Sequence, residues 1–106
     1  MTLKNIQDDV EKWTAQYTPQ YWKPYEILAR LMEEVGELSR EVNHEFGPKK
    51  KKPGEPDNSI GQEISDIVFT LVCMANSQGI NLQDEWDKMV EHKMYGRDKD
   101  RYAKKE

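Results

Sequence analysis

Two short acidic motifs contain the residues of this sequence best suited to chemistry. The first, EEVGE at residues 33–37, places Glu34 and Glu37 three positions apart, and the second is EISD at residues 63–66. Residues three apart on an α-helix have neighbouring side chains, so one cation can contact both carboxylates of such a pair. An isolated pair of this kind is commonly an ordinary solvated helix edge. The first motif by itself therefore leaves a metal site and a charged surface both open.

The second motif lies in one of the most apolar segments of the sequence. Residues 60–75 are apolar on most sides of a helical wheel, which predicts a helix buried between neighbours. Glu63 and Asp66 interrupt this run on one shoulder of the helix, about 60° apart. An unpaired carboxylate is costly in such surroundings, so a buried acid is normally paired, protonated or bound to a metal. This favours a metal site that both acidic pairs form together.

The donor atoms indicate which metal such a site would prefer. Four carboxylates without histidine or cysteine form a hard oxygen site, which suits magnesium, or manganese as a substitute, rather than zinc. A di-iron bundle would need a Glu-x-x-His motif on two helices, and neither acidic pair has its histidine. His44 and His92 lie elsewhere, and we expect both to face solvent.

Convergence of the two pairs depends on the register between their helices. Two helices joined by a loop pack antiparallel, so their acidic shoulders can meet. Glu37 lies nine residues before Phe46, the expected end of its helix, whereas Glu63 lies only about four residues into the next helix. Unless the connection absorbs this offset, the pairs miss each other by about one turn, roughly 5 Å.

Apolar spacing predicts four helices, over residues 3–17, 24–46, 60–78 and 82–95, and no strand. Gly79 is expected to end the third helix, and Asn81 to cap the fourth. Residues 47–59 are rich in proline, glycine and lysine and predict a flexible loop, and the tail from residue 97 is highly charged. We therefore expect one all-α domain over residues 1–106, an up-and-down four-helix bundle. Its second helix is expected to pack through a seam of apolar residues: Leu28, Leu31, Val35, Leu38 and Val42.

Composition limits the size of the core and the compartment. The chain has 106 residues, of which 36% are apolar, and a formal charge of −4. Its core must be small, so we expect a homo-oligomer to complete the bundle, with a tetramer favoured and a dimer possible. No secretory signal is visible, and the apolar run at residues 67–75 is too short to span a bilayer. We expect a cytoplasmic protein with no membrane or nucleic-acid partner, in which Cys73 is a buried small hydrophobe.

The two motifs resemble those of a known family. EEVGELSREV, followed by EISDIVFTLVCMANSQGINL, is similar to the E-E-x-x-E, loop and E-x-x-D pattern of the MazG-like nucleoside triphosphate pyrophosphohydrolases. The resemblance extends over about residues 28–95. It implies a magnesium-dependent enzyme that converts NTP or dNTP to monophosphate and pyrophosphate, removing unwanted nucleotides, with Glu34, Glu37, Glu63 and Asp66 as catalytic metal ligands. Glu33 matches the first motif glutamate and is expected either to act from outside the direct ligand set or to contact another copy in the oligomer.

A nucleoside triphosphate also needs cations for its phosphates and a slot for its base. Lys93 and Arg97 are candidate phosphate contacts, and Arg101 is a further candidate. A solvated basic tail explains these residues equally well. Trp13 belongs to a group of aromatics before the first motif and is a candidate for base stacking, against a core role. Asn76 follows Asp66 by almost three helical turns and either lines the pocket mouth or begins the helix end.

Several alternatives remain open. The lysines at residues 49–52 suit a solvated connector, a lid that attracts triphosphate, or a nucleic-acid contact, in decreasing order of preference. At the level of function, a non-catalytic helical interaction module explains the bundle but leaves Glu63 and Asp66 without a reason to lie in an apolar helix. A regulator that holds metal and nucleotide without cleavage explains all four acids, and only turnover separates it from an enzyme.

Overall fold

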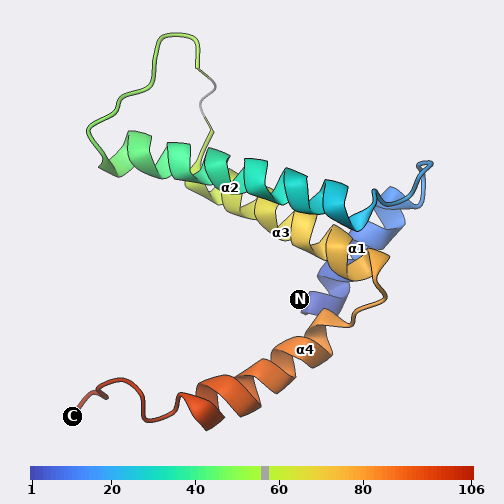
Figure 1. Ribbon diagram of the computed structural model, residues 1–106, viewed down its shortest axis with the longest axis vertical. Coiled ribbons are helices and arrows are strands. Elements are labelled where there is room, and N and C mark those ends of the chain that lie inside the picture. The colour runs from blue at the N-terminus through green and yellow to red at the C-terminus, as the bar shows by residue number, and fades with distance from the viewer. Residues whose placement is uncertain (56–57) are drawn as a thin grey trace.

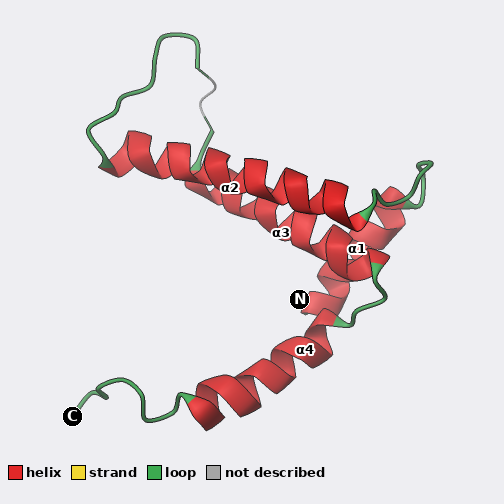
Figure 2. Ribbon diagram, viewed as in Figure 1, coloured by secondary structure: helices red, strands yellow, loops and turns green. Residues whose placement is uncertain are grey.

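The chain forms helices only, with no strand anywhere in residues 1–55 and 58–106, which the computed structural model describes (Figure 2). The helices are α1 (Leu3–Thr14), α2 (Pro24–Phe46), α3 (Ile60–Ser77) and α4 (Leu82–Met89), and a π-helix, η1 (Val90–Arg97), continues α4 directly. The all-α prediction is confirmed. Residues 56 and 57 of the predicted loop lie outside the described residues.

Local capping explains where these helices begin and end. The Thr2, Ser59 and Asn81 side chains each accept a hydrogen bond from a backbone N–H in the first turn of α1, α3 and α4. Pro24 occupies the first turn of α2, where its missing N–H has no helical partner to lose. Gly79 has a φ of +66° just after α3, a conformation that glycine adopts without strain, so it ends the helix as expected.

The helices do not close into a compact unit within one chain. Helices α2 and α3 lie side by side and antiparallel, α1 packs across α3, and α4 with η1 extends away from them as an arm (Figure 1). The radius of gyration is 17.5 Å. A compact chain of this length has a radius of gyration of about 13 Å. The arm therefore leaves much of its own surface, and of α3, without a neighbour.

The face through which α2 packs differs from the predicted seam. Leu28, Val35 and Val42 are 53%, 44% and 41% exposed, so they do not form the intrachain contact. The buried residues of α2 are instead Ile27, Glu34 and Glu41. These residues are seven positions apart, and the half-buried Leu31 and Leu38 lie between them at three-and-four spacing. The two glutamates make this face look polar in sequence. The prediction was wrong for Leu28, Val35 and Val42, because Glu34 and Glu41 occupy buried positions that the apolar residues were expected to fill.

Helix α3 is also less buried than its composition suggests. Val72 and Ala75 are buried and, with Val10 and Ile27, make up the apolar core among the described residues. The expectation of burial on most sides is wrong for the single chain, because α1 and α2, the described helices that pack against α3, leave part of its surface exposed. Its exposed apolar residues are Ile64, Val68, Phe69 and Leu71. Within the described parts of the chain, no helix is long and apolar enough to cross a bilayer.

Candidate metal centre

Four carboxylates converge where α2 passes α3. Glu34 and Glu37 from α2, with Glu63 and Asp66 from α3, each offer one oxygen, and these four oxygens lie within 4.8 Å of one another. The antiparallel course of the helices makes this possible, since α3 begins beside the middle of α2 and not at its end (Figure 1). The connection thus absorbs the register offset that the sequence raises.

The four acids divide into a buried pair and an exposed pair. Glu34 and Glu63 are each only 2% exposed, whereas Glu37 and Asp66 are exposed. The Oε2 atoms of Glu34 and Glu63 are buried and have no hydrogen-bond partner among the described residues. A buried carboxylate oxygen without a partner is costly, so these are the two atoms that a bound cation would stabilise most.

Burial also shifts the pKa values of Glu34 and Glu63. Burial raises the pKa of the Glu34 carboxyl, and the charges of Glu37 and Asp66 raise it further, while the Arg30 guanidinium opposes them. Burial also raises the pKa of Glu63, again with contributions from Glu37 and Asp66. Without a cation, the buried acids are thus held toward their protonated forms.

One arginine neutralises part of the cluster from the preceding turn of α2. Arg30 places one guanidinium nitrogen 2.6 Å from Oε1 of Glu34 and the other 3.1 Å from Oε2 of Glu33. Glu33 is exposed and does not belong to the group of four converging oxygens. It lies beside the cluster and contacts it through Arg30. Sequence reasoning missed Arg30, although its position four residues before Glu34 is the spacing of a helical ion pair.

A hollow opens on the side of the cluster that faces the start of α3. Glu37, Glu63 and Asp66 line it, together with polar residues around the α3 N-terminus: Asn58, Ser59, Gln62 and Ser65. The hollow therefore reaches one buried acid, Glu63, as well as the two exposed ones. A cation and a small polar ligand can enter here without crossing an apolar barrier.

Comparison with known proteins identifies the family to which this chain belongs. The model of the MazG nucleotide pyrophosphohydrolase domain matches residues 23–102, which include both acidic motifs. The chain belongs to the MazG family. Membership makes it a hydrolase, and the regulator without turnover is no longer needed to explain the four acids.

Relatives and solved structures agree with this assignment. The chain is 48% identical over 105 residues to the uncharacterized protein YpjD of Bacillus subtilis (strain 168), covering 99% of this chain and 94% of YpjD. It is 31% identical over 86 residues to the uncharacterized protein YvdC of the same strain, with coverages of 72% and 81%. Its fold matches the crystal structure of YpjD, described as a candidate pyrophosphatase, with a TM-score of 0.75, 45% identity and coverages of 86% and 93%. It also matches a Bacillus-conserved MazG protein, described as a nucleotide pyrophosphohydrolase, with a TM-score of 0.73, 36% identity and coverages of 86% and 87%.

The basic residues predicted for phosphate binding lie apart from the cluster of this MazG chain. Lys93 and Arg97 belong to η1, on the arm that leaves α2 and α3 (Figure 1). Arg97 makes two hydrogen bonds of 3.1 Å to the Asp98 carboxylate, and Arg101 contacts the same group at 3.4 Å. Within one chain, the structure does not bring these cations to the acids.

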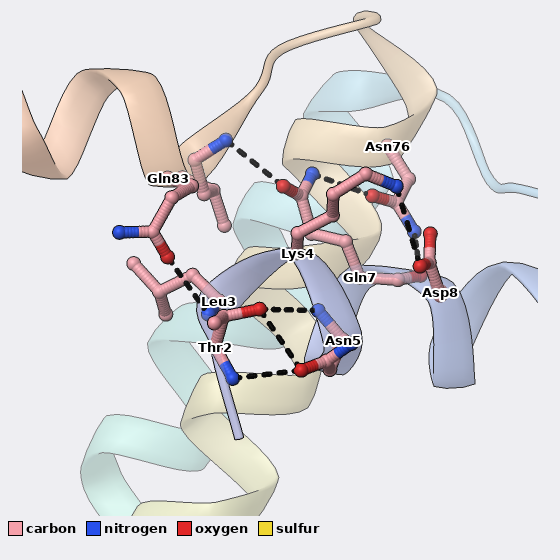
Figure 3. A network of polar contacts seen from close by, with 9 residues as sticks. Thr2, Leu3, Lys4, Asn5, Gln7, Asp8, Asn76 and Gln83 are labelled. Atoms are coloured by element: carbon pink, nitrogen blue, oxygen red, sulfur yellow. Dashed lines mark hydrogen bonds and ion pairs between the residues drawn. The ribbon is translucent and has the colours of Figure 1, made fainter.

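Asn76 serves as a cross-link between α1 and α3 of the MazG fold. Its side-chain amide donates to the Gln7 carbonyl at 3.0 Å and to the Tyr21 hydroxyl at 3.1 Å, and its Oδ1 accepts from Gln7 Nε2 at 2.8 Å. Gln7 also donates to the Ile80 carbonyl and accepts from the Leu82 N–H. This network, with Gln7 and Asn76 at its centre, joins both helices to the start of α4 (Figure 3).

Trp13 lies in an aromatic pocket that is linked to the cluster through Arg30. Its ring contacts Tyr17 and Phe69, with centroid separations of 5.0 and 5.9 Å. The pocket has a volume of about 370 Å³, and its lining includes Trp22, Arg30 and the half-buried Cys73. Cys73 is thus less enclosed than expected, although burial still raises the pKa of its thiol. Phe69 was not foreseen as a pocket residue because it lies within an apolar helix pattern.

The far end of α2 holds two further polar contacts. The His44 side chain is only 5% exposed, which corrects the expectation that it faces solvent, and its Nε2 lies 3.6 Å from Glu55. His92 is 73% exposed, as expected. Lys51, one of the four consecutive lysines, lies 3.1 Å from the buried Glu41 carboxylate. The return of the chain after α2 covers His44 and Glu41, which no spacing within α2 reveals.

Proposed function

We propose that this chain is a magnesium-dependent pyrophosphohydrolase that converts nucleoside triphosphates to the monophosphate and pyrophosphate. The observation that carries the proposal is the group of four carboxylates, two of which bury an oxygen without a partner. Family membership supports pyrophosphohydrolysis, and the donor atoms support the choice of metal. Removal of unwanted nucleotides from the cell is the role we assign to it.

The residues present fit a hard divalent cation. All four donors are carboxylate oxygens, and the two unpartnered ones gain a partner when a cation binds. Magnesium bound there would neutralise the cluster, bridge to phosphate oxygens and lower the pKa of a bound water. Manganese is the expected substitute.

The buried and exposed acids would then have different tasks. Glu34 and Glu63 are fixed by packing between α2 and α3, so they set the position of the site. Glu37 and Asp66 face the hollow, where a carboxylate can bind metal and also accept a proton from an attacking water. Glu33 acts from outside this set by orienting Arg30.

The aromatic pocket is the best available slot for the base. Its volume of about 370 Å³ is within the usual range for small-molecule sites, about 300–1,000 Å³. The ring of Trp13 and its neighbours offer flat surfaces for stacking. Arg30 lines the pocket and also contacts Glu34, so a nucleotide whose base occupies the pocket has its phosphates close to the acids.

We also propose that the working form is a homo-oligomer, with a tetramer favoured. The small core, the extended shape and the exposed apolar face of α3 support this. A second copy would then be able to place Lys93 and Arg97 near the cluster, which their own chain does not do. In that arrangement Asn76 keeps its structural role and stays a candidate for the pocket rim.

The test is a product assay on a panel of NTPs and dNTPs with magnesium. Monophosphate and pyrophosphate are quantified for the wild type, for Glu63→Gln and for Glu45→Gln, an exposed glutamate of α2 outside the cluster. We expect both products in equal amounts from the wild type and from Glu45→Gln. Glu63→Gln and a sample with EDTA are expected to be inactive. Release of inorganic phosphate in place of pyrophosphate, or full activity in EDTA, would contradict the proposal.

A further inference from the structure

Arg30 connects the two halves of the proposed active site. Its side chain lines the aromatic pocket, and its guanidinium lies 2.6 Å from Glu34 and 3.1 Å from Glu33. The side chain is 47% exposed, whereas that of Glu34 is 3% exposed. The cation therefore approaches a buried ligand from a position that solvent, and a ligand in the pocket, can still reach.

The contact with Glu34 satisfies only one of its two carboxylate oxygens. Oε1 has the arginine, while Oε2 is buried without a hydrogen-bond partner among the described residues. In the metal-free chain the arginine thus supplies a positive charge that a divalent cation would otherwise supply. A guanidinium stays protonated at any ordinary pH. Arg30 and a divalent metal ion would therefore compete for the negative charge of Glu34.

We propose that Arg30 exchanges partners during the reaction cycle, leaving Glu34 when the metal binds and then holding a phosphate group of the nucleotide. This inference rests on the proposed function, since it assigns a substrate contact at the same site. Once Glu34 shares its charge with a metal, the attraction that holds the guanidinium is weakened. Arg30 then stands between the pocket and the acids with free donors, and its planar fork fits two phosphate oxygens at once.

Position favours Arg30 over the other arginine considered for phosphate binding. Arg97 lies on η1 and is tied to Asp98 by two hydrogen bonds, on an arm that leaves the α2 and α3 pair (Figure 1). Arg30 comes from the same helix as Glu34 and Glu37, so its distance from the cluster does not depend on a second copy. It also lines the pocket in which a base can stack.

The partner exchange predicts effects of opposite sign on two ligands. Arg30→Gln removes the cation that competes for Glu34, so magnesium alone should bind about three- to five-fold more tightly. The same variant removes the phosphate contact, so a nucleotide should bind about ten-fold more weakly. The nucleotide probe is a dNTP analogue with an imido group between the α- and β-phosphates, which resists cleavage, measured at saturating magnesium.

Both affinities are measured by isothermal titration calorimetry on the full chain at low salt. Lys4→Gln is the matched control, because it removes an exposed helical ion pair of the same spacing, with Asp8, on α1. Its two affinities should equal those of the wild type. Arg30→Lys keeps the charge, so its magnesium affinity should stay near that of the wild type. Its nucleotide affinity should lie between those of the wild type and Arg30→Gln.

The possible results separate this inference from the proposed function. If the wild type binds magnesium and nucleotide but Arg30→Gln leaves nucleotide affinity unchanged, the partner exchange is wrong and the enzyme proposal stands. If Arg30→Gln weakens both ligands and Arg30→Lys restores both, Arg30 only holds Glu34 in place, which also overturns the exchange. If the wild type binds neither ligand, both proposals fall.

Discussion

A carboxylate oxygen of Glu34 lies within 4.8 Å of one from Glu63, although both side chains are buried between α2 and α3. Two acids of like charge in a poorly solvated position destabilise each other when both are ionised. The packing that fixes the site is thus a source of instability in the metal-free chain. Stability and metal binding should respond in opposite directions to changes in these two residues.

Replacing one buried acid by its neutral amide should stabilise the metal-free protein. In Glu63→Gln the repulsion and the desolvated charge are lost while the shape is kept, so the free energy of unfolding should rise by about 1 kcal/mol or more. Urea denaturation in EDTA measures this. Glu45→Gln is the control and should stay within about 0.5 kcal/mol of the wild type. A clear loss of stability in Glu63→Gln would mean that its carboxylate has a protein partner.

Stability of the metal-free protein should fall as pH rises from mildly acidic values. Burial raises the pKa of Glu34 and of Glu63 above that of an unfolded glutamate, so the folded state binds more protons between the unfolded and folded values. The stability that these groups contribute is fully present below the unfolded pKa, about 4.3, and is lost as pH rises through the folded values. Thermal denaturation in EDTA at several pH values checks the sign. The decrease of stability with pH should be smaller in Glu63→Gln.

With magnesium bound, stability should rise with pH near neutrality instead of falling. The metal needs ionised carboxylates, so its binding releases protons from the buried pair and its affinity should increase with pH. Thermal shift with and without magnesium at each pH is the measurement. A magnesium-induced shift that stays constant across the titration range would show that these carboxyls are already ionised in the metal-free protein.

Asn76→Ala should destabilise the junction of α1 and α3. Three hydrogen bonds are lost, two to Gln7 and one to Tyr21, which together contribute about 2–3 kcal/mol. Combining it with Gln7→Ala in a double-mutant cycle should give a coupling of at least about 0.5 kcal/mol, because the residues share a hydrogen bond. Strictly additive losses would place the two side chains in independent roles.

A lysine at an exposed apolar position of α2 or α3 should dissociate the proposed oligomer. Leu71 on α3 and Met32 on α2 are 47% and 64% exposed in the single chain. Leu71→Lys and Met32→Lys should lower the molar mass found by size-exclusion chromatography with light scattering, because a charge is costly at an apolar interface. Ser39→Lys, an exposed position of α2, is the control. A wild type that elutes as a monomer at every concentration would contradict the oligomer.

The sequence predicts the limits of α2 and α3 well because they depend on local chemistry. It places the end of α1 at residue 17 instead of Thr14, and it predicts one helix over residues 82–95 where α4 is continued by the π-helix η1. Pro24, Ser59 and Gly79 act within one turn of their own positions, so the limits of α2 and α3 follow from neighbours in sequence. The acidic cluster is also foreseen, since the two acids of each pair are three residues apart in one helix. The sequence does not determine the register between the two helices.

The packing face of α2 could not be found in this way. Glu34 and Glu41 occupy buried positions that apolar residues usually fill, so a search for apolar periodicity selects Val35 and its neighbours. His44 was misjudged for a related reason, since its cover comes from the chain that follows α2. A polar residue in a packing position is recognised only when its neighbours in space are known.

The small apolar core of the single chain has a consequence for abundance. Among the described residues only Val10, Ile27, Val72 and Ala75 are buried hydrophobics. If copies of the chain complete one another, folding and association are a single equilibrium, and the melting temperature must rise with protein concentration. In a cell that synthesises little of this protein, most chains would then be dissociated and unfolded, and exposed to proteolysis. Its catalytic capacity would fall more steeply than the number of molecules.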